Sequence, residues 1–154
     1  MDLQQKLALL DQCDRYQFRP ELEADMESFL KRNYAVKASL RKFKDDERLN
    51  LIRLCGKLEI NVQNNVRQIG YKFNLLDQYP WEAPHVYLDE PENLAVIKNI
   101  DYLGEKNRIT NDYIKNWAEH KRYQAWANRL NLNELLNEVK QLFCKHPPVP
   151  SNEM

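Results

Sequence analysis

The spacing of apolar residues changes once along this chain, from a helical period to a period of two, and that change limits the folds open to it. Up to Leu30 the apolar residues recur three or four positions apart, as in an amphipathic helix. From Val36 onward apolar and polar residues alternate through several runs, as in strands with one buried face. Helices followed by consecutive strands predict an α+β domain with helices packed on one sheet.

Two helices are predicted before the strands. The first spans Asp2 to Cys13 and has Asp2 at its N-cap position. The second begins at Pro20, a residue that suits the first turn of a helix. The apolar residues of the second helix are Leu22, Met26, Phe29 and Leu30.

Four strands are predicted next, joined by short turns into an antiparallel meander. The first alternates from Val36 to Leu40, and the polar stretch from Lys44 to Arg48 forms the turn after it. The second extends from Leu49 to Val62, and Gly56 marks a bulge or a crowded point in it.

The third strand extends from Val66 to Leu76, after a hairpin turn at Gln63 to Asn65. The fourth is His85 to Leu88. From Asp89 to Trp117 periodicity is poor, which predicts a long irregular segment of the kind that is often functional.

The C-terminal part is predicted to be a helix that begins at Asn131, which sits three residues before Glu134 in a capping-box pattern. Prolines end this helix, so residues 146–154 are expected to form an extended tail. The helix has one apolar stripe, made of Leu132, Leu135, Leu136, Val139, Leu142 and Phe143.

Composition favours a single globular domain over residues 1–154 with protein partners. The hydrophobic fraction of 43% is enough for one core. Lys plus Arg is 23 and Asp plus Glu is 23, so no general attraction to nucleic acid or anionic membranes is expected. The basic and aromatic stretch from His120 to Arg129 does not outweigh this balance, and it could form a short extra helix.

The cysteines and the chain start bear on compartment and cofactors. Cys13, Cys55 and Cys144 are widely spaced, so they form neither a disulfide framework nor a metal site, and a reducing compartment is expected. No cofactor is expected. The chain start lacks the pattern of a signal peptide, and no stretch approaches the roughly 18 apolar residues of a membrane span.

Two segments resemble the ubiquitin-conjugating enzyme fold. LLDQYPWEAPHVYL, from Leu75 to Leu88, is similar to the Tyr-Pro-x-x-x-Pro segment between the last two strands of that fold. RITNDYIKNW, from Arg108 to Trp117, resembles the active-site stretch of the family, with Thr110 at the position of the catalytic cysteine. The His-Pro-Asn element that the family carries upstream is absent here.

The resemblance therefore implies a protein without conjugating activity. Thioester exchange requires a thiolate, which the Thr110 hydroxyl cannot supply at neutral pH. A member of the family that lacks the nucleophile is a ubiquitin-conjugating enzyme variant, or UEV. The entry CDRYQFRPEL and the ending LFCKHPPVPS resemble the endosomal-sorting UEV class at the front of an ESCRT-I subunit.

This class implies a location and a larger assembly. A module of this kind is expected in the cytoplasm, associated with endosomal membranes through its complex. A longer parent chain is expected to contact the other ESCRT-I subunits, since no coiled-coil heptads occur here.

The resemblance implies a ubiquitin site on the first two strands and the neighbouring sheet. Tyr87 keeps the family's aromatic character, whereas Asn74 stands where the family has a large aromatic residue. Ubiquitin offers an apolar patch ringed by basic residues, which suits an acidic turn. The implied contacts are Phe43, Lys44, Asp45, Asp46, Asn74 and Tyr87.

The class also binds peptides of the Pro-Thr/Ser-Ala-Pro type in a groove between sheet and tail, which implies a second site. Its sheet wall falls on Val62 and Arg67, where the family has tyrosines. Its tail wall falls on Pro147, Val149 and Ser151, and Pro150 replaces an expected phenylalanine.

Alternatives remain open. The chain could be the inactive partner subunit of an active ubiquitin-conjugating enzyme, an enzyme with an unrecognised nucleophile, or a scaffold without ubiquitin contact. The acidic turn could be only a solvated hairpin, and the prolines only a helix stop. His85 is expected to be structural, because it lies in a strand without catalytic partners.

Overall fold

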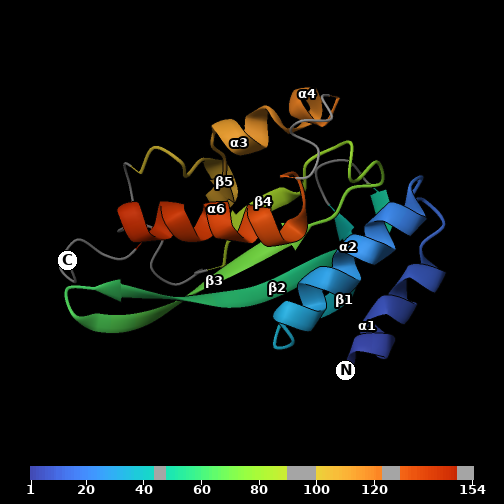
Figure 1. Ribbon diagram of the computed structural model, residues 1–154, viewed down its shortest axis with the longest axis horizontal. Coiled ribbons are helices and arrows are strands. Elements are labelled where there is room, and N and C mark those ends of the chain that lie inside the picture. Colours follow the sequence, from blue (N-terminus) through green and yellow to red (C-terminus); the bar gives the residue numbers. More distant parts are fainter. Residues whose placement is uncertain (44–47, 90–99, 123–128, 149–154) are drawn as a thin grey trace.

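A computed structural model describes residues 1–43, 48–89, 100–122 and 129–148 of the chain. Two N-terminal helices precede a sheet, and a long helix closes the described part (Figure 1). In chain order the elements are α1 (Leu3–Ala8), η1 (Leu9–Gln12), α2 (Arg19–Arg32), β1 (Lys37–Phe43), β2 (Arg48–Val62), β3 (Asn65–Asn74), β4 (His85–Leu88), η3 (Glu105–Asn107), β5 (Arg108–Ile109), α3 (Asp112–Lys115), α4 (Trp117–Lys121) and α6 (Leu132–Lys145).

The first predicted helix is confirmed at its start and wrong at its end. The Asp2 carboxylate accepts a hydrogen bond from the Gln5 amide at 2.8 Å, and the Gln5 side chain accepts one from the Asp2 amide at 2.9 Å, which completes a capping box. After Ala8 the chain tightens into the 3₁₀ helix η1, which buries both Leu9 and Leu10. Adjacent residues on an α-helix point about 100° apart, so the tighter turn brings both leucines into the core.

The second predicted helix is confirmed. Pro20 lies in the first turn of α2, and all four of its predicted apolar residues are buried. The ring centroids of Phe29 on this helix and Phe73 on β3 are 6.0 Å apart, so α2 packs directly on the sheet.

The sheet is the predicted antiparallel meander with one additional strand. Its order is β1-β2-β3-β4-β5. Gln63 and Asn64 have φ values of 50° and 69°, so they form the tight hairpin turn between β2 and β3. The fifth strand pairs Arg108 with Tyr87 and Ile109 with Val86. A strand of two residues is too short to show alternation, which is why the sequence did not reveal it.

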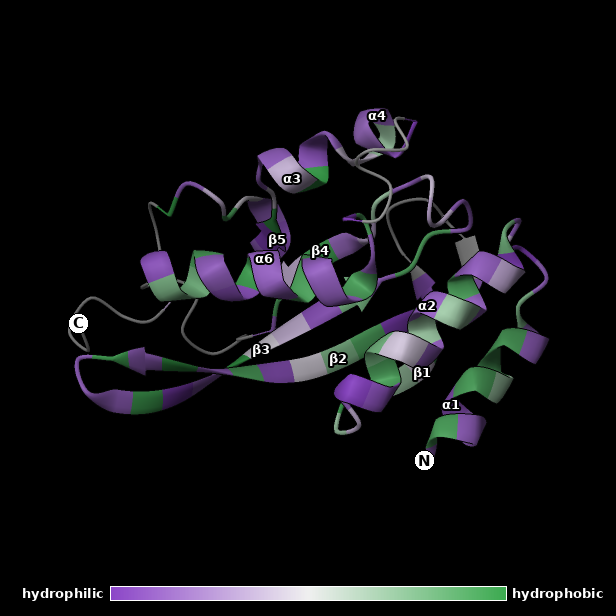
Figure 2. Ribbon diagram, in the orientation of Figure 1, coloured by the Kyte–Doolittle hydropathy of each residue, from purple (hydrophilic) through white to green (hydrophobic). Residues whose placement is uncertain are grey.

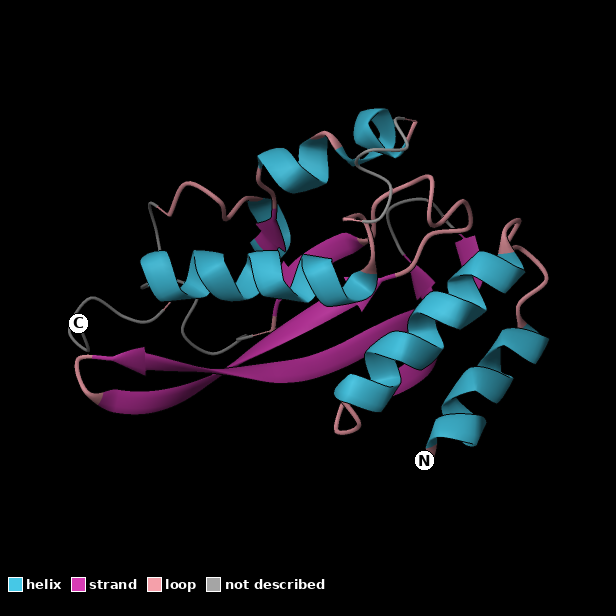
Figure 3. Cartoon of the chain, viewed as in Figure 1, coloured by secondary structure: helices cyan, strands magenta, loops and turns pink. Residues whose placement is uncertain are grey.

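Helices α2 and α6 cover one face of the sheet (Figure 3). Apolar and polar residues alternate along β2 and β3 (Figure 2), and the apolar residues of this alternation are mostly the buried ones. The sheet's contribution to the core includes Leu54, Leu58, Ile60, Ile69, Tyr71, Phe73, Val86, Leu88 and Ile109. The opposite face, which we call the outer face, carries Arg53, Cys55, Lys72, Asn74, His85, Tyr87 and Arg108.

Gly56 marks a crowded point and not a bulge. The β2–β3 register is regular through this residue, which lies opposite Tyr71. A Cβ at position 56 would collide with the Tyr71 ring and hydroxyl. The missing side chain therefore lets the large Tyr71 side chain lie buried between the sheet and the helices.

Four residues, which we call the anchor cluster, tie distant segments together: Asp25, Tyr79, Trp117 and Leu132. The Tyr79 hydroxyl donates to the Asp25 carboxylate, which also accepts the Leu132 amide at 3.1 Å. The Trp117 indole donates to the carbonyl of Pro80 at 2.7 Å. These bonds join α2, the β3–β4 connection, α4 and the start of α6.

The irregular segment is only partly as predicted. Residues 90–99 lie outside the described part of the chain, whereas η3, β5, α3 and the start of α4 lie within the predicted irregular range. Each of these elements is too short to show a period. The C-terminal helix is confirmed as α6, with the Asn131 side chain accepting the Glu134 amide at 2.9 Å.

Candidate functional site

Thr110 lies immediately after the edge strand β5. Its amide donates to the carbonyl of Tyr102 at 2.9 Å, and the preceding Ile109 is fully buried, so the backbone at this position is fixed. The next residue, Asn111, caps α3 by accepting the Ile114 amide at 2.9 Å. The Thr110 side chain is half-buried at the mouth of an open cavity.

This cavity has a volume of about 520 Å³ and joins the Thr110 position to the outer face. Its lining consists of Tyr87, Gly104, Glu105, Lys106, Arg108 and Thr110. Neither a histidine nor a cysteine is among these lining residues. Among the described side chains, Arg108 Nε is buried without a hydrogen-bond partner. A donor in this state is costly unless an acceptor reaches it.

The three cysteines do not supply a nucleophile at this cavity. Cys13 is buried in the N-terminal region, and burial raises the pKa of its thiol to about 11. Cys55 lies on the outer face of β2, and burial followed by the nearby Asp89 charge raises its pKa. Cys144 is exposed on α6. A raised pKa keeps a thiol protonated at neutral pH, opposite to what thioester exchange needs.

The outer face brings two of the expected ubiquitin contacts close together. Asn74 is on β3 opposite His85, and Tyr87 follows on β4 opposite Lys72. Tyr87 is half-exposed, and the Lys72 ammonium lies 6.0 Å from the centre of its ring. Lys72 also lies 3.8 Å from the Asp89 carboxylate.

The side chain of Asn74, another expected ubiquitin contact, is engaged within the sheet. Only 4% of the residue is exposed, and its side-chain oxygen accepts a hydrogen bond from Arg53 Nε at 2.8 Å. The amide therefore orients the Arg53 side chain on the neighbouring strand. Sequence reasoning missed Arg53, although the register between β2 and β3 places it beside Asn74.

The acidic turn lies outside the described residues, which affects three expected contacts: Lys44, Asp45 and Asp46. Phe43 ends β1 and pairs with Arg48 across the start of the turn. The outer face itself carries Arg53, Lys72 and Arg108, so its charge is mainly basic. Carboxylates for a basic partner would therefore have to come mainly from the turn.

The expected peptide groove is only partly described. Val62 is buried at 6% exposure, and Arg67 is half-buried opposite Ile60. Pro147 is half-buried, and Val149 and Ser151 lie outside the described residues. The Tyr102 hydroxyl donates to the carbonyl of His146 at 2.5 Å, so the start of the tail is tied to the core, a contact that sequence reasoning did not find.

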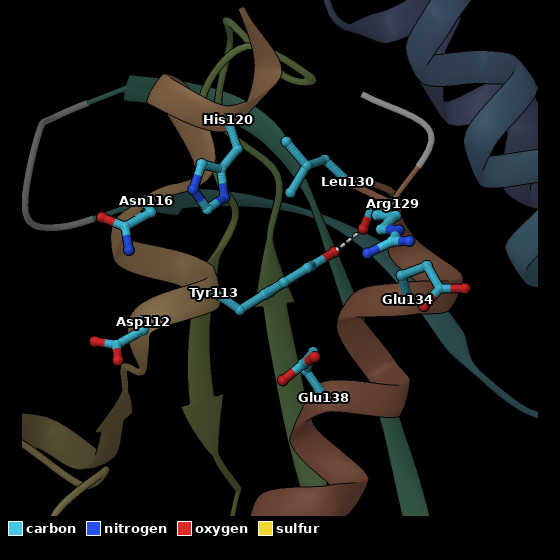
Figure 4. A pocket seen from close by; sticks show the side chains of 8 residues that line it. All are labelled: Asp112, Tyr113, Asn116, His120, Arg129, Leu130, Glu134 and Glu138. Atoms are coloured by element: carbon cyan, nitrogen blue, oxygen red, sulfur yellow. Dashed lines mark hydrogen bonds between the residues drawn. The ribbon is translucent and has the colours of Figure 1, made fainter. Parts of the chain in front are cut away.

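A second cavity, of about 490 Å³, lies between α3–α4 and α6 (Figure 4). The Tyr113 ring crosses it, and the Tyr113 hydroxyl donates to the carbonyl of Arg129 at 2.5 Å. Three carboxylates line it, from Asp112, Glu134 and Glu138, together with the side chains of Arg129 and His120. We call this cavity the acidic cleft. The four-residue spacing of Glu134 and Glu138 puts both on one face of a helix, but nothing in the sequence pairs that face with α3 and α4.

Two absences are limited to the described part of the chain. There, no group of three or more His, Cys, Asp or Glu residues is arranged to hold a metal ion. In the same residues, none of the helices is long and apolar enough to cross a membrane.

Comparison with known proteins identifies the family. The model of the UEV domain family matches residues 8–151. The yeast Vps23 UEV domain, solved in complex with a Vps27 PSDP peptide, is similar with a TM-score of 0.65 and 16% sequence identity, over 82% of this chain and 81% of that chain. The Vps23 UEV in complex with ubiquitin is similar with a TM-score of 0.63 and 14% identity, over 90% of this chain and 89% of that chain. The expected α+β fold and the expected family are both confirmed, and the chain belongs to the UEV domain family.

Proposed function

We propose that this chain is a ubiquitin-binding module of an ESCRT-I-type sorting complex, without conjugating activity. The observation that carries the proposal is the cavity shared by Tyr87 and Thr110. Tyr87, a proposed recognition residue, lies there beside Thr110, the proposed position of the lost nucleophile, and Arg108 lines the cavity with an unpaired buried donor. A partner that supplies an acceptor there would satisfy this donor. The solved complex of a similar UEV with ubiquitin supports ubiquitin as that partner.

The loss of chemistry follows from Thr110 and its neighbours. A hydroxyl nucleophile needs an adjacent base, and the lining of the cavity offers no imidazole. The thiols of Cys13 and Cys55 have raised pKa values, so neither is an activated replacement. A thioester assay with activating enzyme, ATP and ubiquitin should leave the chain unmodified, and a thioester on any of its cysteines would contradict this part.

The proposed contact surface combines the acidic turn with the outer face. Tyr87 supplies an accessible aromatic side chain, and Asn74 acts through its hydrogen bond to Arg53. Phe43, Lys44, Asp45 and Asp46 supply the edge of the surface. Since the outer face is mainly basic, the two aspartates provide the attraction for the basic rim of ubiquitin.

Titration of the isotopically labelled chain with ubiquitin, followed by NMR, tests this surface. Amide shifts should concentrate at residues 43–48, Asn74 and Tyr87. Reversing both Asp45 and Asp46 to lysine should weaken binding about fivefold or more, because rim charges steer association. Glu21→Lys, at an exposed position on α2, is the matched control and should change nothing. Absence of shifts at about 1 mM ubiquitin would overturn the proposal.

A second site for proline-rich peptides is favoured by the anchoring of the tail. The bond between Tyr102 and His146 holds the tail against the core, and Pro148 is buried beyond it. The similar yeast UEV was solved with a PSDP peptide. A Pro-Thr-Ala-Pro peptide should then shift the amides of Val62, Arg67, Val149 and Ser151. Shifts elsewhere, or none, would leave ubiquitin as the only proposed ligand.

The alternative function is that of an inactive partner subunit of an active ubiquitin-conjugating enzyme. It predicts a stable heterodimer with such an enzyme, visible by sedimentation. The sorting-complex proposal expects none. Under the sorting-complex proposal, residues 1–154 form a single domain in the cytoplasm. A longer parent chain binds the other ESCRT-I subunits, and the complex attaches the domain to endosomal membranes. The proposal assigns no nucleic-acid ligand.

A further inference from the structure

Trp81 is an exposed aromatic residue that the proposed ubiquitin and peptide surfaces do not include. It is 44% exposed, in the connection between β3 and β4. An exposed tryptophan is a frequent centre of protein–protein contacts, because it buries a large apolar area and loses little side-chain entropy.

Hydrogen bonds hold the backbone of the turn that carries Trp81. The Trp81 amide donates to the carbonyl of Gln78 at 2.8 Å. Within that turn, the Tyr79 hydroxyl is bonded to Asp25 and the carbonyl of Pro80 accepts the Trp117 indole. The anchor cluster therefore fixes the backbone, so that binding at Trp81 would not have to order a mobile loop.

A cleft of about 430 Å³ lies between this turn and the helices α3 and α4. Trp81, Ala83, Ile114, Trp117 and Ala118 contribute its apolar lining. The ring of Phe18 lies 6.3 Å from that of Trp81, which supports the Trp81 side chain beside the cleft. We call this space the Trp81 cleft. It is large enough for one or two apolar side chains of a partner.

The charges around the Trp81 cleft are unbalanced. Lys115 and Arg122 line it, both exposed, and within the described residues the structure assigns neither of them an ion-pair partner. Glu82 is the only carboxylate in the lining, and it already interacts with another group. The acidic cleft, by contrast, borders the same helices α3 and α4 with three carboxylates. The excess of basic side chains in the Trp81 cleft therefore favours a ligand that carries negative charges.

We propose that the Trp81 cleft is a docking site for a partner-protein segment that carries an apolar side chain flanked by Asp or Glu residues. The apolar side chain packs on Trp81, Ala83 and Ile114. The flanking carboxylates pair with Lys115 and Arg122. This site is separate from the outer face, so it does not depend on ubiquitin binding.

The test uses the full chain and two synthetic peptides, Asp-Glu-Leu-Phe-Glu-Asp and Lys-Arg-Leu-Phe-Arg-Lys, each blocked at both ends. NMR titration with the acidic peptide should shift the indole N–H signal of Trp81 and the amides of Lys115 and Ala118. The basic peptide should bind there at least about tenfold more weakly, because its positive charges are repelled by Lys115 and Arg122. Equal affinities, or no shift with the acidic peptide at about 2 mM, would overturn the proposal.

Variants separate recognition from folding. Trp81→Ser and the double change Lys115→Glu with Arg122→Glu should each weaken the acidic peptide about tenfold. Lys140→Glu, exposed on α6, is the matched charge control and should leave the affinity unchanged. Unchanged amide signals along β2 and β3, which do not line the cleft, report an intact fold. Ubiquitin shifts should persist in Trp81→Ser; their loss would instead join Trp81 to the ubiquitin surface and contradict a separate site.

Discussion

The anchor cluster and the outer face of the sheet both combine aromatic and charged residues, but they satisfy their polar groups in opposite ways. In the anchor cluster, Tyr79 and the Leu132 amide both donate to Asp25, so the buried groups find partners inside the chain. On the outer face, Tyr87 is half-exposed and Arg108 Nε has no acceptor. The first arrangement stabilises the fold, and the second leaves interactions for a partner to complete.

The residues that carry the resemblance to the conjugating-enzyme fold lie mainly on the anchor-cluster side of this division. Tyr79, Pro80 and Trp117, which match the family, lie in or beside the anchor cluster. Asn74 lies on the outer face, and Thr110, which the proposed function puts in the place of the nucleophile, lies beside its cavity. The proposed loss of chemistry would leave the fold intact, because different residues carry the two properties.

Trp117→Ala should give the largest effect, on stability. This side chain is fully buried between the rings of Tyr79 and Tyr113, and its indole bonds to Pro80. Its removal should cost about 3–5 kcal/mol in the free energy of unfolding, measured with urea. Trp81→Ala is the control in the same segment; because Trp81 is exposed, it should cost below about 1 kcal/mol. Equal losses of unfolding free energy in the two variants would contradict the different contributions of the two tryptophans to stability.

Asp25→Ala should come next. It leaves the Tyr79 hydroxyl and the Leu132 amide without their acceptor, both in a largely buried setting. The loss should be about 2–3 kcal/mol in the free energy of unfolding, since unpaired buried donors are costly. Tyr79→Phe in the same background should restore part of this loss, because it removes one of the stranded donors. If Tyr79→Phe instead lowered the free energy of unfolding as much in the Asp25→Ala variant as in the wild type, the Tyr79–Asp25 hydrogen bond would not explain the loss.

Asn74 and Tyr87 should show opposite patterns when each is changed to alanine. Asn74→Ala removes the acceptor of the Arg53 Nε hydrogen bond. It should lower the free energy of unfolding by about 1–2 kcal/mol, with little change in ubiquitin affinity. Tyr87→Ala removes an accessible ring and should weaken ubiquitin binding severalfold, with a loss of stability of about 1 kcal/mol or less. Urea unfolding and NMR titration measure the two effects. A large affinity loss for Asn74→Ala would show that its amide touches ubiquitin directly.

The long elements of the fold could be predicted from the sequence because their periodicity is strong. In the structure, the predicted apolar residues of α2 and most of those of α6 are buried, and the alternation along β2 and β3 matches their buried positions. The 3₁₀ turn at Leu9 and the strand at Arg108–Ile109 could not, since each is too short for an apolar pattern to recur within it. Their positions depend on contacts with residues far away in the chain.

The site was less predictable, because side-chain accessibility depends on the three-dimensional packing. The sequence places Asn74 on a strand, but only the register with β2 reveals that Arg53 holds its side chain. The hydrogen bond from Tyr102 to His146 spans 44 positions and leaves no local signal. The acidic turn could be recognised in the sequence and remains a prediction.

The smallest expected effect is on the pH dependence of stability, and it again tests the anchor cluster. Burial raises the pKa of the Asp25 carboxyl above its ordinary value of 3.8, although hydrogen bonds from Tyr79 and Leu132 and the charge of Lys121 oppose this. The folded chain thus holds this proton more tightly than the unfolded chain. The stability that the proton gives is present below pH 3.8 and is lost as the pH rises through the raised pKa.

Asp25→Asn isolates this contribution, because asparagine keeps an acceptor for Tyr79 and Leu132 but does not ionise. Urea unfolding from about pH 4 to about pH 7 should show the wild-type chain losing stability relative to Asp25→Asn as the pH rises. Other carboxylates titrate in both chains, so they cancel in the difference. A difference that grows in favour of the wild type would mean that the hydrogen bonds outweigh burial. The Asp25 carboxylate would then stabilise the anchor cluster through its charge.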